Sequence, residues 1–177
     1  EREFPVTAKP KERAKGSRGL YQLSDNFFRF WYSFVFPYRS ELERGDVEGV
    51  YERHIKPVLH DFAGKPFEGL CREWMWRESA AGRLPFRARA VGRWRDRQDE
   101  IDVMAVDNAS DAAIVGECKF RNAPVDRSVL NLLRDRAART GIGLLFSLGG
   151  FDQSLVDDAA ASQSDVQLVG IDELFHE

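Results

Sequence analysis

The chain has 177 residues, of which 43% are hydrophobic and 12% aromatic, and its formal net charge is −3. This composition indicates a globular protein and excludes a disordered chain, which would carry fewer aromatic residues and a larger charge imbalance. The length allows one domain, or one domain with a small appendage. The charge gives no global basic field of the kind that attracts nucleic acid, but a local basic groove is compatible with it.

The cysteines and the apolar runs predict the cellular context. Cys71 and Cys118 both lie in apolar stretches, so we expect reduced thiols, which favour the cytoplasm. No apolar run approaches ~18 residues, so no membrane-spanning helix is expected. The first residue is Glu1 rather than Met, and we expect the chain to be a fragment of a longer protein.

The first part of the chain predicts a hairpin followed by helices. Residues 1–23 form a ragged hairpin pattern with a basic, turn-rich link, which is typical of a winged-helix wing or of a solvated loop. Residues 24–62 predict an aromatic-rich helical linker. Within it, residues 25–36 place the rings of Phe27, Phe30, Trp31 and Phe34 at helical spacing up to Pro37. A second helix is expected at about 46–61. We interpret the aromatic stripe as a packing face rather than a platform for stacking nucleotides.

Residues 63–177 predict an α/β domain with a mixed central sheet flanked by helices. Its first helix, at about 65–78, would carry an apolar stripe formed by Phe67, Leu70, Cys71, Trp74 and Met75. The stretch "IGLLFSL" is apolar throughout, which is typical of a strand covered on both faces. The expected order is α-β-β-β-α-β-α-β: a helix at about 65–78, strands in "PFRARAVGRW", "DEIDVMAVD" and "AAIVGECKF", a helix in "PVDRSVLNLLRDRAART", the strand "IGLLFSL", a helix in "DQSLVDDAAAS" and a strand in "DVQLVGI".

The strand "IVGECKF" combines apolar residues with an acid and a base. Glu117 and Lys119 are two residues apart, so both point to the same face of a strand. Antiparallel pairing about a hairpin centre between residues 109 and 110 would bring Asp102 opposite Glu117. Desolvation offsets the attraction within a buried ion pair, which favours a functional use of these residues. The alternative is a structural Glu–Lys pair, with Asp102 capping a strand.

Two carboxylates and an ammonium group suit phosphate chemistry. Carboxylate oxygens bind hard cations such as Mg²⁺, and a bound metal ion acidifies water and neutralises charge on a phosphate. We therefore predict a phosphodiester-hydrolysing site in which Asp102, Glu117 and the backbone carbonyl of Cys118 hold Mg²⁺ or Mn²⁺. Lys119 would position the attacking water or the phosphate.

The preceding strand pattern is rich in arginine. Arg93, Trp94 and Arg95 are candidates for nucleic-acid contact, with the arginines on phosphates and the indole ring on a base. The alternative is an edge strand that its charges protect against aggregation, with Trp94 packed in the core. The sequence leaves both interpretations open.

The arrangement of these residues resembles a known nuclease motif. Asp102, followed on the next strand by Glu117 and Lys119, is similar to the motif of the PD-(D/E)xK nuclease superfamily, with Ile101 in place of its proline. The resemblance implies the restriction-endonuclease-like fold, whose core order αβββαβ matches residues 63–148. It also implies a further acid on the first core helix, where Glu68 stands.

A closer resemblance covers nearly the whole chain. The stretches "YQLSDNFFRFWYSFVFP", "GKPFEGLCREW", "GRWRDRQDEIDVMAVD" and "GECKFRNAPVD" resemble the C-terminal domain of unknown function of archaeal-type AAA ATPases. The resemblance implies an N-terminal P-loop ATPase and a winged helix, of which residues 1–23 would be the end. No Gly-x-x-x-x-Gly-Lys-Ser/Thr motif is present, so ATP would bind only in that separate module.

Together the motif and the resemblance imply a Mg²⁺-dependent DNA nuclease domain attached to an ATPase. Its partners would be DNA and the protein's own ATPase and winged-helix domains. The alternative is a non-catalytic module that keeps the nuclease fold, binds DNA or a partner, and regulates the ATPase.

Overall fold

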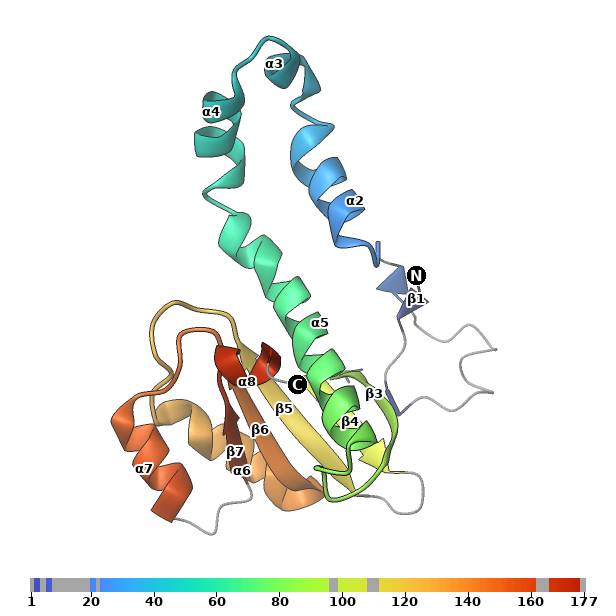
Figure 1. The fold of residues 1–177 in the computed structure, drawn as a ribbon, viewed down its shortest axis with the longest axis vertical. Helices are drawn as coiled ribbons and strands as arrows, with labels where there is room; N and C mark the ends of the chain where they lie inside the picture. The colour runs from blue at the N-terminus through green and yellow to red at the C-terminus, as the bar shows by residue number, and fades with distance from the viewer. Residues whose placement is uncertain are drawn as a thin grey trace.

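The protein forms a mixed sheet with helices on both faces and a helical arm that projects away from it (Figure 1). Within the described residues, no helix is long and apolar enough to cross a membrane. The structure, a computed structural model, describes residues 2–3, 6–7, 20–21, 23–95, 99–107, 112–161 and 166–175.

The main sheet has five strands in the spatial order β3-β4-β5-β6-β7. The first two pairings are antiparallel and the last two are parallel, so the predicted α/β class, mixed sheet and element order are confirmed. The apolar strand β6 lies between β5 and β7, which explains why both of its faces are buried. The strands are β3 (Ala88–Arg95), β4 (Glu100–Asp107), β5 (Ala113–Lys119), β6 (Gly141–Ser147) and β7 (Val166–Val169).

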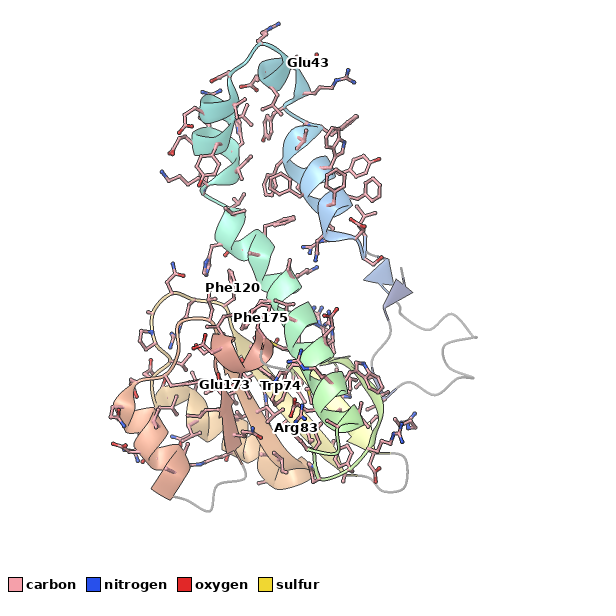
Figure 2. The ribbon with its side chains drawn as sticks, in the orientation of Figure 1. Glu43, Trp74, Arg83, Phe120, Glu173 and Phe175 are labelled. Atoms are coloured by element: carbon pink, nitrogen blue, oxygen red, sulfur yellow. The ribbon has the colours of Figure 1, made fainter. Side chains whose placement is uncertain are left out.

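One face of the sheet is covered by α5 (Leu59–Ala80) and the short α8 (Ile171–Phe175). The indole Nε1 of Trp74 donates to the carbonyl of Glu173 at 3.0 Å, which fastens α8 to α5 (Figure 2). Four α5 side chains of the predicted stripe are buried against the sheet: Phe67, Cys71, Trp74 and Met75. Leu70, also expected in this stripe, is exposed, because it lies at the edge of the buried face of the helix.

The other face of the sheet is covered by α6 (Ser128–Thr140) and α7 (Gln153–Ala161). Val115 of β5 belongs to this second core cluster, whereas Ile114 belongs to the cluster beneath α5. This alternation is that of a strand buried on both faces. The α6 and α7 residues buried in this cluster are Leu130, Leu133, Ala137 and Leu155.

The arm is a helical hairpin that leads into α5. Its outgoing part is α2 (Asn26–Phe30) and a π-helical turn, η1 (Trp31–Val35). The chain returns through α3 (Arg39–Glu43), α4 (Val47–Val50) and a second π-helical turn, η2 (Tyr51–Ile55).

The aromatic stripe of the arm packs only in part. The rings of Phe30 and Phe34 meet Phe62 edge to face, at 6.0 and 5.0 Å between centroids. The packing expected for Phe27 and Trp31 is wrong, because both are exposed. A hairpin arm offers one neighbouring segment, which covers a narrower stripe than a full core would.

The helix α5 is longer than the sequence indicates. One helix ending near residue 61 and another beginning near residue 65 were expected, but α5 runs unbroken for 22 residues and includes Pro66. A proline has no N–H and so removes one hydrogen bond from the helix interior. The expected boundary between residues 24–62 and 63–177 therefore falls inside this helix, which belongs to both the arm and the sheet domain.

The N-terminal residues form a small ladder of their own. Arg2–Glu3 (β1) pairs antiparallel with Leu20–Tyr21 (β2), in keeping with the expected hairpin. Residues 8–19, which include the whole of its predicted link, lie outside the described residues. The backbone N–H of Val6 donates to the carbonyl of Arg93 at 3.0 Å, which attaches this segment to β3.

Candidate functional site

The predicted register of β4 against β5 is confirmed. The paired residues, Val103 with Gly116 through Val106 with Ala113, have the hairpin centre that the sequence indicates. The ladder ends at the Val103–Gly116 pair, one position before Asp102 and Glu117 would meet. There the carboxylate of Asp102 accepts a hydrogen bond at 2.9 Å from the backbone N–H of Cys118.

Asp102 lies at an irregularity of β4. Gly92 of β3 pairs with Met104 and Trp94 pairs with Ile101, so Asp102 and Val103 together stand opposite a single residue of β3. Such a bulge bends the strand and redirects a side chain, and bulges are frequent beside active sites. The bulge accounts for the separation of Asp102 from the regular ladder.

Glu117 is held by two cations. Its Oε1 lies 2.7 Å from the Nζ of Lys119, which confirms that the two side chains share a face. Its Oε2 accepts from the guanidinium of Arg136 on α6 at 2.7 Å, and the same guanidinium reaches Asp99 at 2.5 Å. The side chain of Glu117 is 15% exposed and that of Lys119 31%, so the site is partly open. No spacing pattern in the sequence indicates Arg136, which reaches the site only through the packing of α6.

Glu68 approaches from α5, as the resemblance implies. Its carboxylate lies 2.5 Å from the guanidinium of Arg93 and 4.0 Å from that of Arg72. Arg93 also pairs with Glu100 at 3.2 Å, so the residue predicted to contact DNA is engaged by acids within the protein. Burial of these charges makes the pairing costly to break.

The side chains of the other two predicted nucleic-acid contacts, Trp94 and Arg95, have different surroundings. Trp94 packs against the core cluster beneath α6, in keeping with the packing alternative. Arg95 is exposed at the end of β3.

The surroundings of Asp102 disfavour its charged form. Burial raises the pKa of its carboxyl to about 6, the N–H of Cys118 opposes the rise, and repulsion by Glu117 and Glu68 adds to it. Glu117 and Glu68 therefore both lie within electrostatic range of Asp102, and a cation placed at Asp102 would relieve the repulsion. Burial also raises the pKa of the Cys118 thiol, which is in hydrogen-bond contact with the thiol of Cys71, and both cysteines are free, as expected.

The oxygen donors of the site are of the type that hard cations bind. Asp102 and Glu117 offer carboxylates and Cys118 a backbone carbonyl, and Mg²⁺ is usually bound by one or two carboxylates together with several waters. In the part of the chain that the structure describes, no group of three or more His, Cys, Asp or Glu side chains is placed to hold a metal ion. Asp102 is the site carboxylate with no ion-pair partner among the described residues, and Glu117 would have to share its oxygens with Lys119 and Arg136.

Comparison with known sequences gives a family match and one relative. A family described as archaeal and bacterial proteins of unknown function matches residues 31–137. The chain is 32% identical over 137 residues to the uncharacterized protein MJECL04 of Methanocaldococcus jannaschii. This match covers 76% of the chain but only 29% of that protein, so the chain spans less than a third of its curated relative.

Comparison with solved structures gives two distant likenesses. The DNA modification-dependent restriction endonuclease AspBHI is 18% identical with a TM-score of 0.45, over 67% of this chain and 32% of that one. The MspJI restriction endonuclease, in complex with a 27-mer oligonucleotide, is 17% identical with a TM-score of 0.48, over 71% and 30% of the two chains. Both TM-scores are below 0.5, so the function is inferred below from the residues of the site.

Proposed function

The chain belongs to the family of archaeal and bacterial proteins of unknown function known as DUF234, and from that premise we propose that it is a Mg²⁺- or Mn²⁺-dependent DNA nuclease domain. One observation carries the proposal. Asp102, Glu117 and Lys119 lie at the end of the β4–β5 ladder. There the Asp102 carboxylate accepts a hydrogen bond from the N–H of Cys118, and Lys119 pairs with Glu117. The resemblance of these residues to the PD-(D/E)xK motif supports it.

Each residue of the site has a role in this proposal. Asp102, Glu117 and the carbonyl of Cys118 would hold the metal ion, which when bound supplies an acidified water and neutralises charge on the phosphate. Lys119 holds the phosphate or orients the attacking water. Glu68 adds negative potential at Asp102 from the side of α5.

The positioning of Glu117 depends on Arg136. The guanidinium joins Glu117 to Asp99, so it fixes the carboxylate against the end of α6. A residue that orients a site carboxylate in this way acts through its partner rather than on the substrate.

A second candidate is a non-catalytic module that keeps the nuclease fold and regulates a partner. It is favoured by the engagement of both Glu117 oxygens, one by Lys119 and one by Arg136. In this case the ion pairs lock the end of β5 against α6, and the domain binds DNA or a partner protein without cleavage.

We also propose the setting of the domain in a longer protein. Residues 1–23 would end a winged helix, residues 24–62 would link it to the nuclease-like domain at 63–177, and an N-terminal P-loop ATPase would bind ATP. The length of the relative, of which this chain spans 29%, leaves room for such modules. The free thiols of Cys71 and Cys118 favour a cytoplasmic location.

The deciding experiment is a cleavage assay on plasmid and branched DNA with Mg²⁺ or Mn²⁺. General acid–base and positioning groups contribute about 10²- to 10⁴-fold, so Asp102→Ala and Lys119→Ala should each lose at least ~100-fold in rate. Asp135→Ala, which removes an exposed acid of α6, is the matched control and should cleave normally. Equal cleavage by all four proteins, or none by the wild type, would refute the nuclease proposal.

A further inference from the structure

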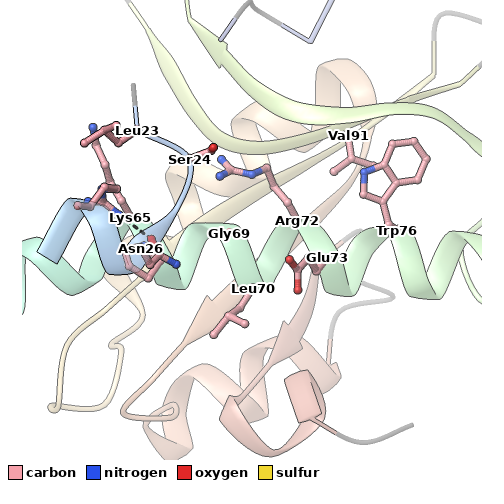
Figure 3. A pocket seen from close by; sticks show the side chains of 12 residues that line it. Leu23, Ser24, Asn26, Lys65, Gly69, Leu70, Arg72, Glu73, Trp76 and Val91 are labelled. Atoms are coloured by element: carbon pink, nitrogen blue, oxygen red, sulfur yellow. Dashed lines mark hydrogen bonds between the residues drawn. The ribbon is translucent and has the colours of Figure 1, made fainter. Parts of the chain in front are cut away.

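A hollow of about 510 Å³ lies along α5 and is bounded by the start of α2 and by Val91 of β3 (Figure 3). Its volume falls within the range of small-molecule and cofactor sites, ~300–1,000 Å³. The site residues Asp102, Glu117 and Lys119 do not line it. The lining residues are Leu23, Ser24, Asn26, Arg29, Lys65, Pro66, Gly69, Leu70, Arg72, Glu73, Trp76 and Val91.

Cations predominate among the charged residues of the lining. Arg29, Lys65 and Arg72 face one acid, Glu73. Lys65 is exposed and has no ion-pair partner among the residues that the structure describes. Arg29 is held in place by Asn26, whose side-chain oxygen accepts from its guanidinium at 3.0 Å. The hollow therefore attracts anions, and one of its arginines is already oriented.

The same side of α5 carries an exposed indole. Lys65, Arg72 and Trp76 are seven and then four residues apart, so they follow one side of the helix. Trp76 is 43% exposed, although a large aromatic ring gains most when it is covered. Figure 3 shows the indole ring beside Val91 at one end of the hollow, with Arg72 nearer the centre.

Gly69 leaves the floor of the hollow open. A Cβ atom added there would meet only a nitrogen of Arg72, at 3.9 Å, so a larger side chain could project into the space. The position therefore offers a way to fill the hollow without disturbing the helix.

The hollow is linked to the candidate site by charge. Arg72 lines the hollow and also lies 4.0 Å from Glu68, whose potential acts on Asp102. Arg72 therefore places one wall of the hollow next to the acids of the candidate site.

We propose that this hollow binds a single DNA strand, with phosphates on Lys65, Arg72 and Arg29 and a base stacked on Trp76. The inference rests on the proposed nuclease function and narrows its substrate to DNA with unpaired nucleotides beside the cleaved bond. A base within a duplex is covered on both faces and cannot stack on the indole. Cations that follow the backbone, combined with an aromatic ring that accepts any base, are the elements of single-strand binding sites.

The test measures the binding of a fluorescent oligothymidylate by anisotropy in EDTA, where no cleavage occurs. Trp76→Ala should weaken binding about tenfold, because base stacking on an aromatic ring is worth that much or more. Lys65→Ala should flatten the salt dependence by ~0.7 in the logarithmic slope, the value for one phosphate contact on a single strand. Gly69→Leu, which fills the hollow, should also weaken binding about tenfold or more.

Matched controls come from the arm. Lys56→Ala and Tyr32→Ala remove an exposed lysine and an exposed aromatic ring outside the hollow, and both should bind as the wild type does. A duplex of the same length and thymidine 5′-phosphate should both compete poorly, because neither offers an unpaired base with neighbouring phosphates. Wild-type binding by the three hollow variants, or equal affinity for strand and mononucleotide, would overturn the proposal.

The test is independent of the fate of the nuclease proposal. Asp135→Ala should bind the strand normally in EDTA, because this exposed acid of α6 lies outside both the hollow and the candidate site. Strand binding that depends on the hollow in a protein without cleavage activity would refute the nuclease function alone. If the protein cleaves DNA but its strand binding does not depend on Trp76 or Lys65, only the proposal that the hollow binds the strand would be refuted.

Discussion

The backbone N–H of Cys118 donates to the carboxylate of Asp102 at 2.9 Å, just beyond the last pair of the β4–β5 ladder. A regular antiparallel ladder would satisfy such a group with the backbone of the neighbouring strand. Here the side chain of Asp102 accepts this hydrogen bond instead. The protein thereby keeps a carboxylate at a buried position, where repulsion from two other acids disfavours its charged form.

The first prediction concerns stability and pH in EDTA. The pKa of Asp102 is about 6 in the folded protein and near 4 when unfolded, so the folded form binds the extra proton between these values. Stability therefore falls as pH rises from 4 to 6, and the loss persists above pH 6. Asp102→Asn keeps an acceptor for Cys118 and should gain about 2–3 kcal/mol at pH 8 but nothing near pH 4.

Urea unfolding at several pH values measures this effect. Asp135→Asn is the control, because it changes an exposed acid of α6, and its stability relative to the wild type should not vary in the same way. An equal gain in stability from Asp102→Asn at pH 4 and pH 8 would show that the pKa of Asp102 is not raised in the folded protein.

The second prediction concerns metal binding. If the acids hold a cation, excess Mn²⁺ should stabilise the wild type by mass action, by ~2.7 kcal/mol at 100 times the dissociation constant. The melting temperature should then rise by several degrees. Asp102→Asn removes one of the two carboxylate donors and should lose the shift. Thermal unfolding with Mn²⁺ and with EDTA measures it, and an identical shift in both proteins would place the metal elsewhere.

The third prediction concerns the ion pair between Glu117 and Arg136, in which both side chains are 15% exposed. Arg136→Met leaves Glu117 with Lys119 alone and should cost about 2–4 kcal/mol, because an under-compensated charge remains buried. A double-mutant cycle with Glu117→Gln should give a coupling of at least ~1 kcal/mol.

The exposed pair Arg39–Glu43 on the arm supplies the comparison. The same cycle there should give less than ~0.5 kcal/mol, as is usual for surface pairs. Equal couplings at the two places, measured by urea unfolding, would contradict the interpretation that Arg136 fixes Glu117.

The fourth prediction concerns Gly116, which precedes Glu117. A Cβ atom there would stand 3.0 Å from the Phe146 ring and 3.2 Å from the carbonyl of Val103, closer than packed atoms normally approach. Gly116→Ala should cost about 1–3 kcal/mol by overpacking. Gly64→Ala, in α5 with nothing within 4 Å, should instead stabilise by up to ~1 kcal/mol. Unfolding in urea compares the two, and a neutral Gly116→Ala would mean that the strand adjusts freely.

The sequence alone predicted those features that depend on the side-chain period of a strand and on the pairing of neighbouring strands. The twofold period of β5 places Ile114 and Phe120 in the cluster beneath α5 and Glu117 toward α6. The turn-like sequence "NASD" indicates the register of β4 against β5. Both are local properties, so they can be inferred without knowledge of the rest of the fold.

What the sequence could not supply are the tertiary partners. Arg136 is one arginine among several on α6, and only the packing angle of that helix brings it to Glu117. Arg93 looked available for a phosphate until α5 placed Glu68 beside it. The bulge at Asp102 depends on how β3 pairs, and the unbroken course of α5 depends on core contacts that outweigh the helix-breaking tendency of Pro66.

The unbroken course of α5 also has a mechanical consequence. The helix spans ~33 Å, so the arm and the sheet domain are connected by a single stiff rod. The hydrogen bond missing at Pro66 gives that rod a point of low bending stiffness two residues before Glu68. A force on the arm therefore bends α5 next to Glu68 before it deforms the sheet. Of the site residues, Glu68 is the one whose position depends most on a partner that binds the arm.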